Sequence, residues 1–167
     1  MKNAEHKSNT PTEIRDLWQT PKFVFNYYNK RFDFGMDVAA SKENTFVELN
    51  YWTQADDELK QNWSVWGNWC NPPYSDIMPW VKKAISEMKQ GCLTVMLIPA
   101  DTSVKWFREA FDNCTECHFI SGRLSFINAE TQKPVSGNNK GSVVFIFDPK
   151  SPVKQSVHLI DRDSMKG

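Results

Sequence analysis

Apolar residues recur at helical spacing in two stretches of the chain. The first stripe, which stops before Gly91, consists of Ile77, Trp80, Val81, Ala84, Ile85 and Met88, and the second consists of Trp106, Phe107, Ala110 and Phe111. Residues three and four positions apart share one face of an α-helix, so both stretches predict amphipathic helices that cover a core. The residues expected to cap their starts are Ser75 or Asp76 and Thr102 or Ser103. A further helix is expected over residues 21–31, because Thr20 can cap it and Pro21 suits its first position.

Continuous apolar runs of strand length lie between these helices. The clearest is residues 92–98, CLTVMLI, which predicts a strand covered on both faces of a sheet. Further strands are expected over residues 34–40, 64–70, 116–121, 123–127 and 142–147. Strands that alternate with helices and then gather near the end predict an α/β fold. We expect a Rossmann-like methyltransferase fold with a mostly parallel sheet, helices on both faces and an antiparallel terminal hairpin.

Three stretches are polar or weakly patterned. Residues 1–15 predict a flexible lead-in to a single domain over residues 16–167, a length that suits one core. Thr53 and Asp56 have the spacing of a capping box, which predicts a short helix through Asn62. Residues 128–141 are rich in turn formers and predict a mobile loop between two sheet strands, placed where it can contact the substrate.

The tetrapeptide Asn71-Pro72-Pro73-Tyr74 follows a predicted strand, at the edge of an α/β sheet where ligands bind. The Asn71 side-chain oxygen and the Pro72 carbonyl can each accept a hydrogen bond from one N–H of an exocyclic amine, which turns the nitrogen lone pair towards a methyl donor. The prolines restrict the backbone, so the second carbonyl is held in place. Tyr74 offers an aromatic face on which a base rotated out of a duplex can stack. The motif therefore predicts methylation of a planar amine.

The tetrapeptide leaves several functions open. Cytosine N4, an adenine of RNA and the amide of a protein glutamine are planar amines that the same four residues can methylate. A catalytically silent DNA-binding protein can keep the same fold, although its tetrapeptide is expected to be damaged and this one is intact. A strand-ending proline turn whose tyrosine merely packs is the less favoured alternative.

The charge balance excludes one way of binding nucleic acid. The chain has 20 Lys and Arg against 20 Asp and Glu, so its formal net charge is zero. It lacks the strongly basic balance of proteins that hold nucleic acid mainly through phosphates. Any affinity for DNA is therefore expected to reside in a local patch, for which Arg123, Lys133 and Lys140 around the polar loop are candidates. Phe126 is a candidate for packing against the flipped base.

The opening residues and the cysteines bear on the cellular compartment. No apolar export signal is present, and no apolar run reaches the roughly 18 residues of a membrane helix, so we expect a cytoplasmic protein without a membrane partner. The cysteines expected to be reduced thiols are Cys70, Cys92, Cys114 and Cys117. Cys114 to His118 matches the CxxCH pattern of haem attachment, but that reaction requires export, and no second ligand pair completes a zinc site. We expect neither haem nor metal.

An ordered set of motifs resembles the phage-type DNA N6-adenine methyltransferases, small proteins related to the Dam enzymes. The set consists of Asp16-Leu-Trp-Gln-Thr-Pro21, Phe34-Gly-Met-Asp-Val-Ala-Ala-Ser41 followed by Asn44, Asn71-Pro-Pro-Tyr74, Leu97-Ile-Pro-Ala-Asp-Thr102 with Trp106-Phe107, and Gly122-Arg-Leu-Ser-Phe126. The resemblance implies methyl transfer from S-adenosylmethionine to N6 of a flipped adenine in duplex DNA, in the cytoplasm of a bacterial host cell. It implies no obligate protein partner.

The resemblance also implies which residues hold S-adenosylmethionine. Thr20 and Pro21 open a helix that contacts the methionine end of the cofactor, and Trp18 lines that pocket. Asp37 ends the first strand near the cofactor amino group. Asp57 is a candidate at the adenine ring or its amine.

The chain departs from the wider methyltransferase pattern after its first strand. The glycine-rich turn of many methyltransferases is here Ala39-Ala40-Ser41, which places Ala39 beside the cofactor. The ribose-binding acidic residue is left open: Glu48 is possible, but a surface charge is the favoured interpretation. No separate target-recognition domain fits this length, so the recognition sequence in DNA is not predicted.

Overall fold

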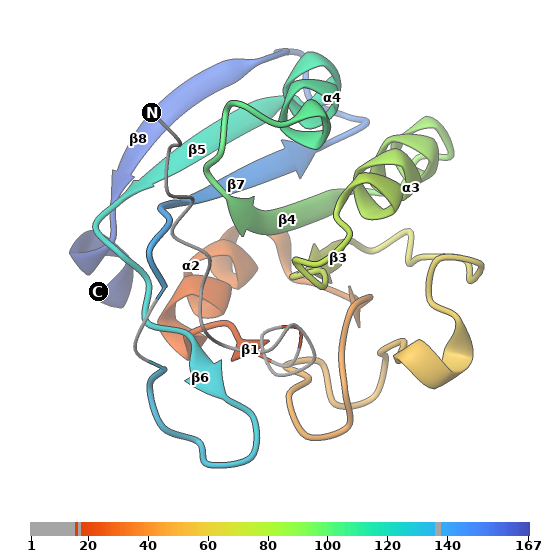
Figure 1. Ribbon diagram of the computed structural model, residues 1–167. Coiled ribbons are helices and arrows are strands. Elements are labelled where there is room, and N and C mark those ends of the chain that lie inside the picture. The colour runs from red at the N-terminus through yellow and green to blue at the C-terminus, as the bar shows by residue number, and fades with distance from the viewer. Residues whose placement is uncertain (1–15, 17, 136–137) are drawn as a thin grey trace, which may run out of the picture.

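A mixed six-stranded sheet forms the centre of the structure, a computed structural model that describes residue 16, residues 18–135 and residues 138–167. Figure 1 shows the strands, whose order across the sheet is β2-β3-β4-β7-β5-β8. Their bounds are β2 Met36–Asp37, β3 Asn68–Cys70, β4 Thr94–Pro99, β5 Glu116–Ser121, β7 Ser142–Phe147 and β8 Ser156–Asp161. The α/β class predicted from the sequence is confirmed.

The strand directions place one edge of the sheet beside the tetrapeptide. The pairs β2–β3, β3–β4 and β5–β8 are parallel, whereas β7 runs antiparallel to both β4 and β5. Because β4 and β5 both oppose β7, the strands β3, β4 and β5 all end at the same edge. The predicted antiparallel end of the sheet is only partly present: β7 is antiparallel to β5 but pairs with β4 as well, and β8, which was not predicted, pairs in parallel with β5. The expectation of a mostly parallel sheet is not confirmed by this mixed arrangement.

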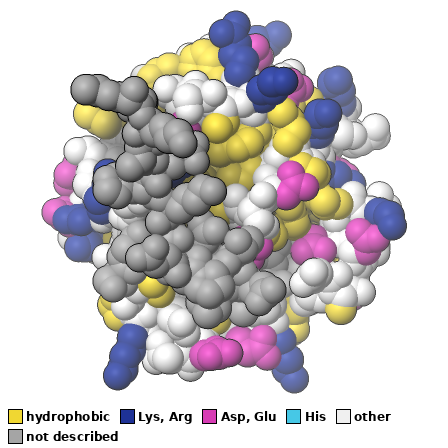
Figure 2. All heavy atoms as spheres, in the orientation of Figure 1, with side chains coloured by type: hydrophobic (Ala, Val, Ile, Leu, Met, Phe, Trp, Pro, Cys, Tyr) yellow, Lys and Arg dark blue, Asp and Glu magenta, His cyan; other side chains and the backbone are white. Residues whose placement is uncertain are grey.

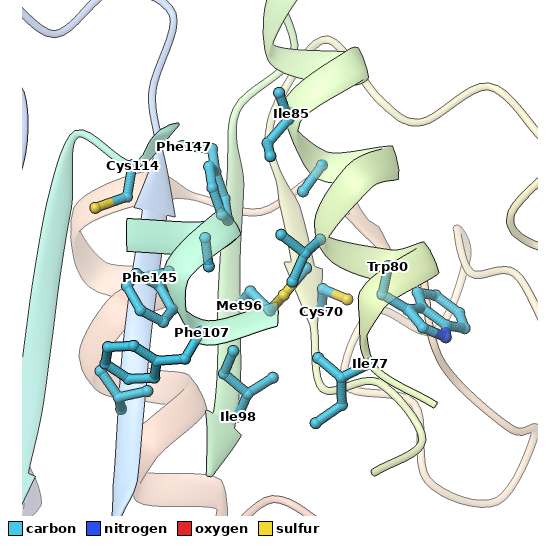
Figure 3. Packing of buried hydrophobic residues seen from close by; sticks show 14 of the residues in the cluster. Cys70, Ile77, Trp80, Ile85, Met96, Ile98, Phe107, Cys114, Phe145 and Phe147 are labelled. Atoms are coloured by element: carbon cyan, nitrogen blue, oxygen red, sulfur yellow. The ribbon is translucent and has the colours of Figure 1, made fainter. Parts of the chain in front are cut away.

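Helices cover both faces of the sheet, as predicted. The helices α3 (Met78–Lys89) and α4 (Lys105–Asn113) lie on one face, and α2 (Lys22–Phe32) lies on the other. Figure 3 shows Trp80 and Ile85 of α3 and Phe107 of α4 on the same face of the sheet as Phe145 and Phe147 of β7, with the Phe107 ring beside that of Phe145. The strands β4 and β7 alternate their side chains between two buried clusters, which is why both read as unbroken apolar runs.

The residues predicted to cap the three helices were wrong. The residues at the cap positions of α2, α3 and α4 are Pro21, Ile77 and Val104, and none of them makes a side-chain capping bond. Thr20 precedes the cap of α2 and is 2% exposed, but its hydroxyl has no hydrogen-bond partner among the described residues. The predicted capping box is present: Asp56 accepts hydrogen bonds from the amide and the hydroxyl of Thr53. The helix that it starts is only the 3-10 helix η1 (Gln54–Asp56), much shorter than predicted.

A small second sheet lies beside the carboxyl edge of the main one. Its two antiparallel strands are β1 (Trp18–Gln19) and β6 (Ile127–Asn128), so little of the strand predicted over residues 123–127 forms. A second 3-10 helix, η2 (Asp163–Lys166), packs against α2. The predicted lead-in at residues 1–15 lies outside the described residues. Among the helices described, none combines the length and the apolar character needed to cross a membrane.

Candidate active site

The tetrapeptide begins where β3 ends, at the carboxyl edge of the sheet, as predicted. Asn71 donates a hydrogen bond from Nδ2 to the backbone carbonyl of Trp18 over 3.3 Å. Its other terminal atom, Oδ1, is buried and has no partner among the described residues. Because a carbonyl can only accept, the Trp18 contact identifies which end of the Asn71 amide is the nitrogen. A hydrogen-bond acceptor is thus left open at this position.

The aromatic residue of the motif is held by a stack of rings. The Tyr74 hydroxyl donates to the Leu97 carbonyl over 3.3 Å, and burial raises the pKa of Tyr74. Its ring packs edge-on against Phe126 with centroids 5.9 Å apart, and Phe126 in turn stacks on Trp18 at 6.0 Å. Phe126 is only 1% exposed, so it supports Tyr74 and Trp18 from the core and has no open surface for a base. This placement favours support of the neighbouring rings over a direct contact of Phe126 with DNA.

A small cavity of about 10 Å³ opens beside Asn71, which is room for about one water molecule. Its lining consists of Trp18, Gln19, Thr20, Asp37, Ala39, Asn44, Phe46, Trp69 and Asn71. The structure therefore brings together four of the six residues assigned to the cofactor from the sequence, namely Trp18, Thr20, Asp37 and Ala39, which lie up to 21 positions apart. Gln19 and Phe46 were not predicted to line the cofactor site. Gln19 belongs to the motif that runs from Asp16 to Pro21, whereas nothing in the local sequence pattern indicates Phe46.

A much larger cavity of about 780 Å³ adjoins the small one and shares Ala39 and Asn44 with it. Its remaining lining is Asp16, Ala40, Ser41, Lys42, Glu43, Thr53, Gln54, Ala55, Glu58, Leu59, Pro73, Ser75, Asp76, Pro79 and Trp80. This volume lies within the roughly 300–1,000 Å³ of small-molecule sites. The wall combines apolar surface from α3 with polar groups from two loops, which suits a ligand with a flat ring and several hydroxyl groups.

Unpartnered polar atoms gather around these two cavities. Five buried side-chain N or O atoms have no hydrogen-bond partner among the described residues. Four of them belong to residues that line the cavities, namely Trp18 Nε1, Thr20 Oγ1, Ser41 Oγ and Asn71 Oδ1, and the fifth is Thr94 Oγ1. A buried polar atom without a partner costs about 1–3 kcal/mol. Their concentration at one place fits a site whose polar contacts are completed by a ligand.

Asp37 is the charged group of the small cavity. It is 4% exposed, and its carboxylate accepts two long backbone hydrogen bonds, from Ala39 and Phe46, each of 3.4 Å. Burial raises its pKa to about 7, and these two hydrogen bonds only partly offset the effect. A carboxyl group in this state is stabilised in its charged form by a cation, such as the amino group expected here.

Three other residues considered for the cofactor lie elsewhere. Pro21 caps α2 and is buried outside both linings. Asp57 is exposed with φ of 55° and pairs with Lys60 over 2.6 Å, and Glu48 is also exposed. Neither acid lines a cavity, whereas Glu58 does, and burial raises the pKa of Glu58. Asp56-Asp57-Glu58 is a run of three acids, and the sequence alone does not indicate which of them faces inwards.

The candidate DNA residues emerge at the same edge, because the segment after β5 returns there to begin β7. Arg123 and Lys133 are exposed, and Arg123 is attached through its carbonyl to the Arg162 guanidinium. Lys140 instead pairs with Asp101 over 3.0 Å. Hydrogen bonds from Ser103 and then from Lys140 lower the pKa of Asp101 to about 2. In Figure 2, Lys and Arg side chains stand around the rim of this face with Asp and Glu side chains among them.

The CxxCH segment belongs to a separate polar cluster between β5, β8 and α2. Glu116 forms a bidentate pair with Arg31, and it also bonds to His118 Nε2, whose Nδ1 is 3.0 Å from the Tyr28 hydroxyl. Glu116, His118 and His158 have ligand-type atoms within 4.8 Å of one another. The Arg31 guanidinium already occupies the Glu116 carboxylate, and this pairing lowers the pKa of Glu116 to about 2. Cys114 and Cys117 are buried free thiols whose pKa values burial raises to about 12 and about 11.

Comparison with known proteins connects this geometry to a family. A family model described as DNA N-6-adenine-methyltransferase (Dam) matches residues 7–167. The chain belongs to this family. It is 42% identical to a DNA N-6-adenine-methyltransferase of Escherichia phage T1, over 92% of this chain and 71% of the relative. It is 39% identical to a DNA N-6-adenine-methyltransferase of Haemophilus phage HP1 (strain HP1c1), over 87% of this chain and 86% of the relative. The resemblance stated from the motifs is confirmed.

Proposed function

We propose that this protein transfers a methyl group from S-adenosylmethionine to the exocyclic N6 of an adenine rotated out of duplex DNA. The observation that carries the proposal is the set of four unpartnered polar atoms around two adjoining cavities, directly beside an intact Asn71-Pro72-Pro73-Tyr74. Membership of the DNA N-6-adenine-methyltransferase family supports adenine N6 over the other planar amines.

The tetrapeptide prepares the amine for reaction. The free Asn71 Oδ1 accepts one N–H of the adenine amine, and the Pro72 carbonyl accepts the other. Two acceptors favour a pyramidal nitrogen whose lone pair leaves the plane of the ring, which is the geometry that methylation needs. Tyr74 supplies the aromatic surface for the flipped base, and its fixed hydroxyl and the Phe126 ring behind it keep that surface in one orientation.

The residues of the cavities fit S-adenosylmethionine. When bound, the cofactor supplies an electrophilic methyl group on its sulfonium sulfur. Asp37 would hold the amino group of the methionine end, and Thr20 Oγ1 and Trp18 Nε1 would offer hydrogen bonds to its carboxylate, where the small cavity adjoins the larger one that has the room for the cofactor. In the larger cavity, Trp80 and Leu59 would pack against the adenosine ring, and Glu58 is the acidic residue of that lining. Pro21 contributes by fixing the start of α2, and Asp57 lies outside the lining of the cavity.

The wider setting follows from the same proposal. A sheet with helices on both faces and a single reversed strand among its neighbours supports a Rossmann-like methyltransferase fold in one domain over residues 16–167. The partner is duplex DNA in the host cytoplasm, and no obligate protein partner or metal enters the proposed reaction.

The decisive experiment is incubation of the protein with methyl-labelled S-adenosylmethionine and methylation-free duplex DNA. Digestion to nucleosides is expected to yield labelled N6-methyladenine. Label in N4-methylcytosine would identify cytosine as the substrate base. Label only in added RNA or protein would identify an RNA adenine or a glutamine amide as the substrate. A protein that binds the duplex but leaves it unlabelled would be a catalytically silent DNA-binding protein.

Replacing Thr20 with Val is expected to weaken S-adenosylmethionine binding roughly five- to tenfold, because the hydroxyl loses one hydrogen bond to the cofactor while the side-chain volume is kept. Thr94→Val is the matched control, since Thr94 Oγ1 is also buried without a partner but lines neither cavity. Titration calorimetry measures both affinities. Equal affinities for the two variants would remove Thr20 from the cofactor site.

Replacing Lys133 with Ala is expected to lower the slope of log affinity for DNA against log salt by about 0.9, the contribution of one phosphate contact. Lys140→Ala is expected to change the slope less, because Asp101 already neutralises that lysine. Lys150 is an exposed lysine beyond the end of β7, at the opposite edge of the sheet, and Lys150→Ala serves as the control. Binding of a duplex at several salt concentrations gives the slopes. An unchanged slope for Lys133→Ala would show that the loop does not contact DNA.

A further inference from the structure

The segment formed by Asp16, Trp18 and Gln19, here called the strap, is bonded to the tetrapeptide at Asn71 and to the residue that follows it, Ser75. The Asp16 carboxylate accepts hydrogen bonds from the Ser75 amide over 3.2 Å and from the Ser75 hydroxyl over 2.6 Å. The carbonyl of Trp18 accepts the bond from Asn71 Nδ2. The strap is therefore bonded to the first residue of the motif and to the residue that follows it.

The other contacts of the strap keep it in place along its length. Trp18 and Gln19 form the strand β1 against β6, and the Trp18 ring stacks on Phe126. The Gln19 side-chain amide donates to the Asn44 carbonyl over 3.0 Å. The Trp18 carbonyl that accepts the Asn71 bond thus belongs to a segment that is held by a strand pairing, a ring contact and a side-chain hydrogen bond. The Asp16–Ser75 pair holds the same segment next to the tetrapeptide.

The Asn71 contact decides which atom the motif presents to its substrate. A rotation of the amide by 180° would exchange Oδ1 and Nδ2, so that two carbonyl oxygens would face each other at Trp18 and a donor would face the substrate amine. One hydrogen bond with a net worth of about 1 kcal/mol biases this choice roughly fivefold, and the repulsion between the oxygens adds to the bias. The orientation of Asn71 therefore depends on how firmly the Trp18 carbonyl is held.

We propose that Asp16 and Ser75 are positioning residues of the methyl transfer, which act by holding the strap so that the Trp18 carbonyl aims Asn71 Oδ1 at the target amine. This inference rests on the proposed function. Neither residue touches the amine. Loss of their hydrogen bonds lowers the fraction of molecules with a correctly oriented Asn71, so it lowers kcat at saturating cofactor and DNA.

The first measurement compares kcat for Asp16→Ala, Ser75→Ala and Ser75→Thr. Loss of the bias reverses Asn71 in at most half of the molecules, so Asp16→Ala and Ser75→Ala are expected to lower kcat about 1.5- to 2-fold with an unchanged KM for DNA. Ser75→Thr, which keeps the hydroxyl, is expected to retain most of the wild-type kcat. The control is Ser164→Ala, because Ser164 is an exposed serine whose hydroxyl likewise donates a hydrogen bond, to the carbonyl of Asp161 at the end of β8 over 2.7 Å. Thermal unfolding of all four variants identifies any loss that comes from folding.

The second measurement tests whether the strap acts through Asn71. In Asn71→Asp both terminal atoms of the side chain are oxygens, so no amide is left to orient. Asp16→Ala is therefore expected to leave kcat unchanged in the Asn71→Asp background, against a loss of about 1.5- to 2-fold in the wild type. Equal losses in both backgrounds, or a wild-type kcat for both Asp16→Ala and Ser75→Ala, would overturn the inference. A wild-type protein that does not methylate adenine would instead contradict the proposed function, and the role of the strap with it.

Discussion

Replacing Asn71 with Ala is expected to lower kcat by roughly a hundredfold or more, with a change in S-adenosylmethionine affinity of no more than about twofold. Among the described residues, Asn71 is the one whose side-chain amide oxygen is buried and has no hydrogen-bond partner. It contributes most when the amine nitrogen becomes pyramidal, and removal of one preorganised polar group of this kind costs about 10²–10³ in turnover. Single-turnover methylation and calorimetry separate the two quantities.

Asn113→Ala is the matched control for this substitution. Asn113 also bonds to a backbone carbonyl through its amide nitrogen, but it does so within α4, where it contacts Glu109. Its loss is expected to leave kcat near the wild-type value. A turnover of Asn71→Ala within about threefold of the wild type would contradict the assigned mechanism, and an equally large loss of cofactor affinity would move Asn71 from the amine to the cofactor.

The parts of the fold that the sequence predicts are those where burial leaves a clear mark on composition. The stripe from Ile77 to Met88 and the run that became β4 were predictable because one face or both faces of each element are buried. The strand β8 was not, because it lies at the edge of the sheet with Val157 and Leu159 exposed on it, Leu159 by 73%. The side chains of such an edge strand do not alternate between buried apolar and exposed polar positions, so its sequence has no period that predicts a strand.

The site shows the same division between local and tertiary information. The tetrapeptide was placed correctly because two prolines end a strand by their own chemistry. The sequence does not show which acid of the run faces inwards, because this depends on how one loop packs, and that loop places Glu58 in the lining of the cavity and pairs Asp57 with Lys60. The hydrogen bond from Asn71 to Trp18 joins residues 53 positions apart, so no local sequence pattern predicts it.

Asp37 is expected to make cofactor binding depend on pH. Burial raises its pKa to about 7, so near neutral pH part of the free protein carries an uncharged carboxyl group. The cofactor amino group is positive and binds the charged form. Cofactor affinity is therefore expected to rise with pH between about 6 and 8, as the carboxyl group loses its proton.

The same carboxyl group is expected to destabilise the protein without cofactor. Its pKa is higher in the folded state than the ordinary value of 3.8, so between about pH 4 and pH 7 the folded state binds more protons than the unfolded state does. The free energy of unfolding then falls as pH rises through this window. The stability contribution is complete below the unfolded pKa and is lost above the folded pKa.

Asp37→Asn is therefore expected to change binding and stability in opposite directions. At pH 8 the variant is expected to bind S-adenosylmethionine roughly ten- to a hundredfold more weakly, since a charge-assisted hydrogen bond worth about 1.5–3 kcal/mol is lost. Without cofactor it is expected to unfold a few degrees higher than the wild type at pH 8, with a gain of about 1 kcal/mol or more, and to show no such gain at pH 4. Calorimetry at pH 6 and 8 and thermal unfolding at pH 4 and 8 give the four values. Glu130→Gln is the control, because Glu130 is an exposed acid that lines neither cavity. Weaker binding together with lower stability at pH 8 would assign Asp37 a structural role, whereas unchanged binding at both pH values would place the cofactor amino group elsewhere.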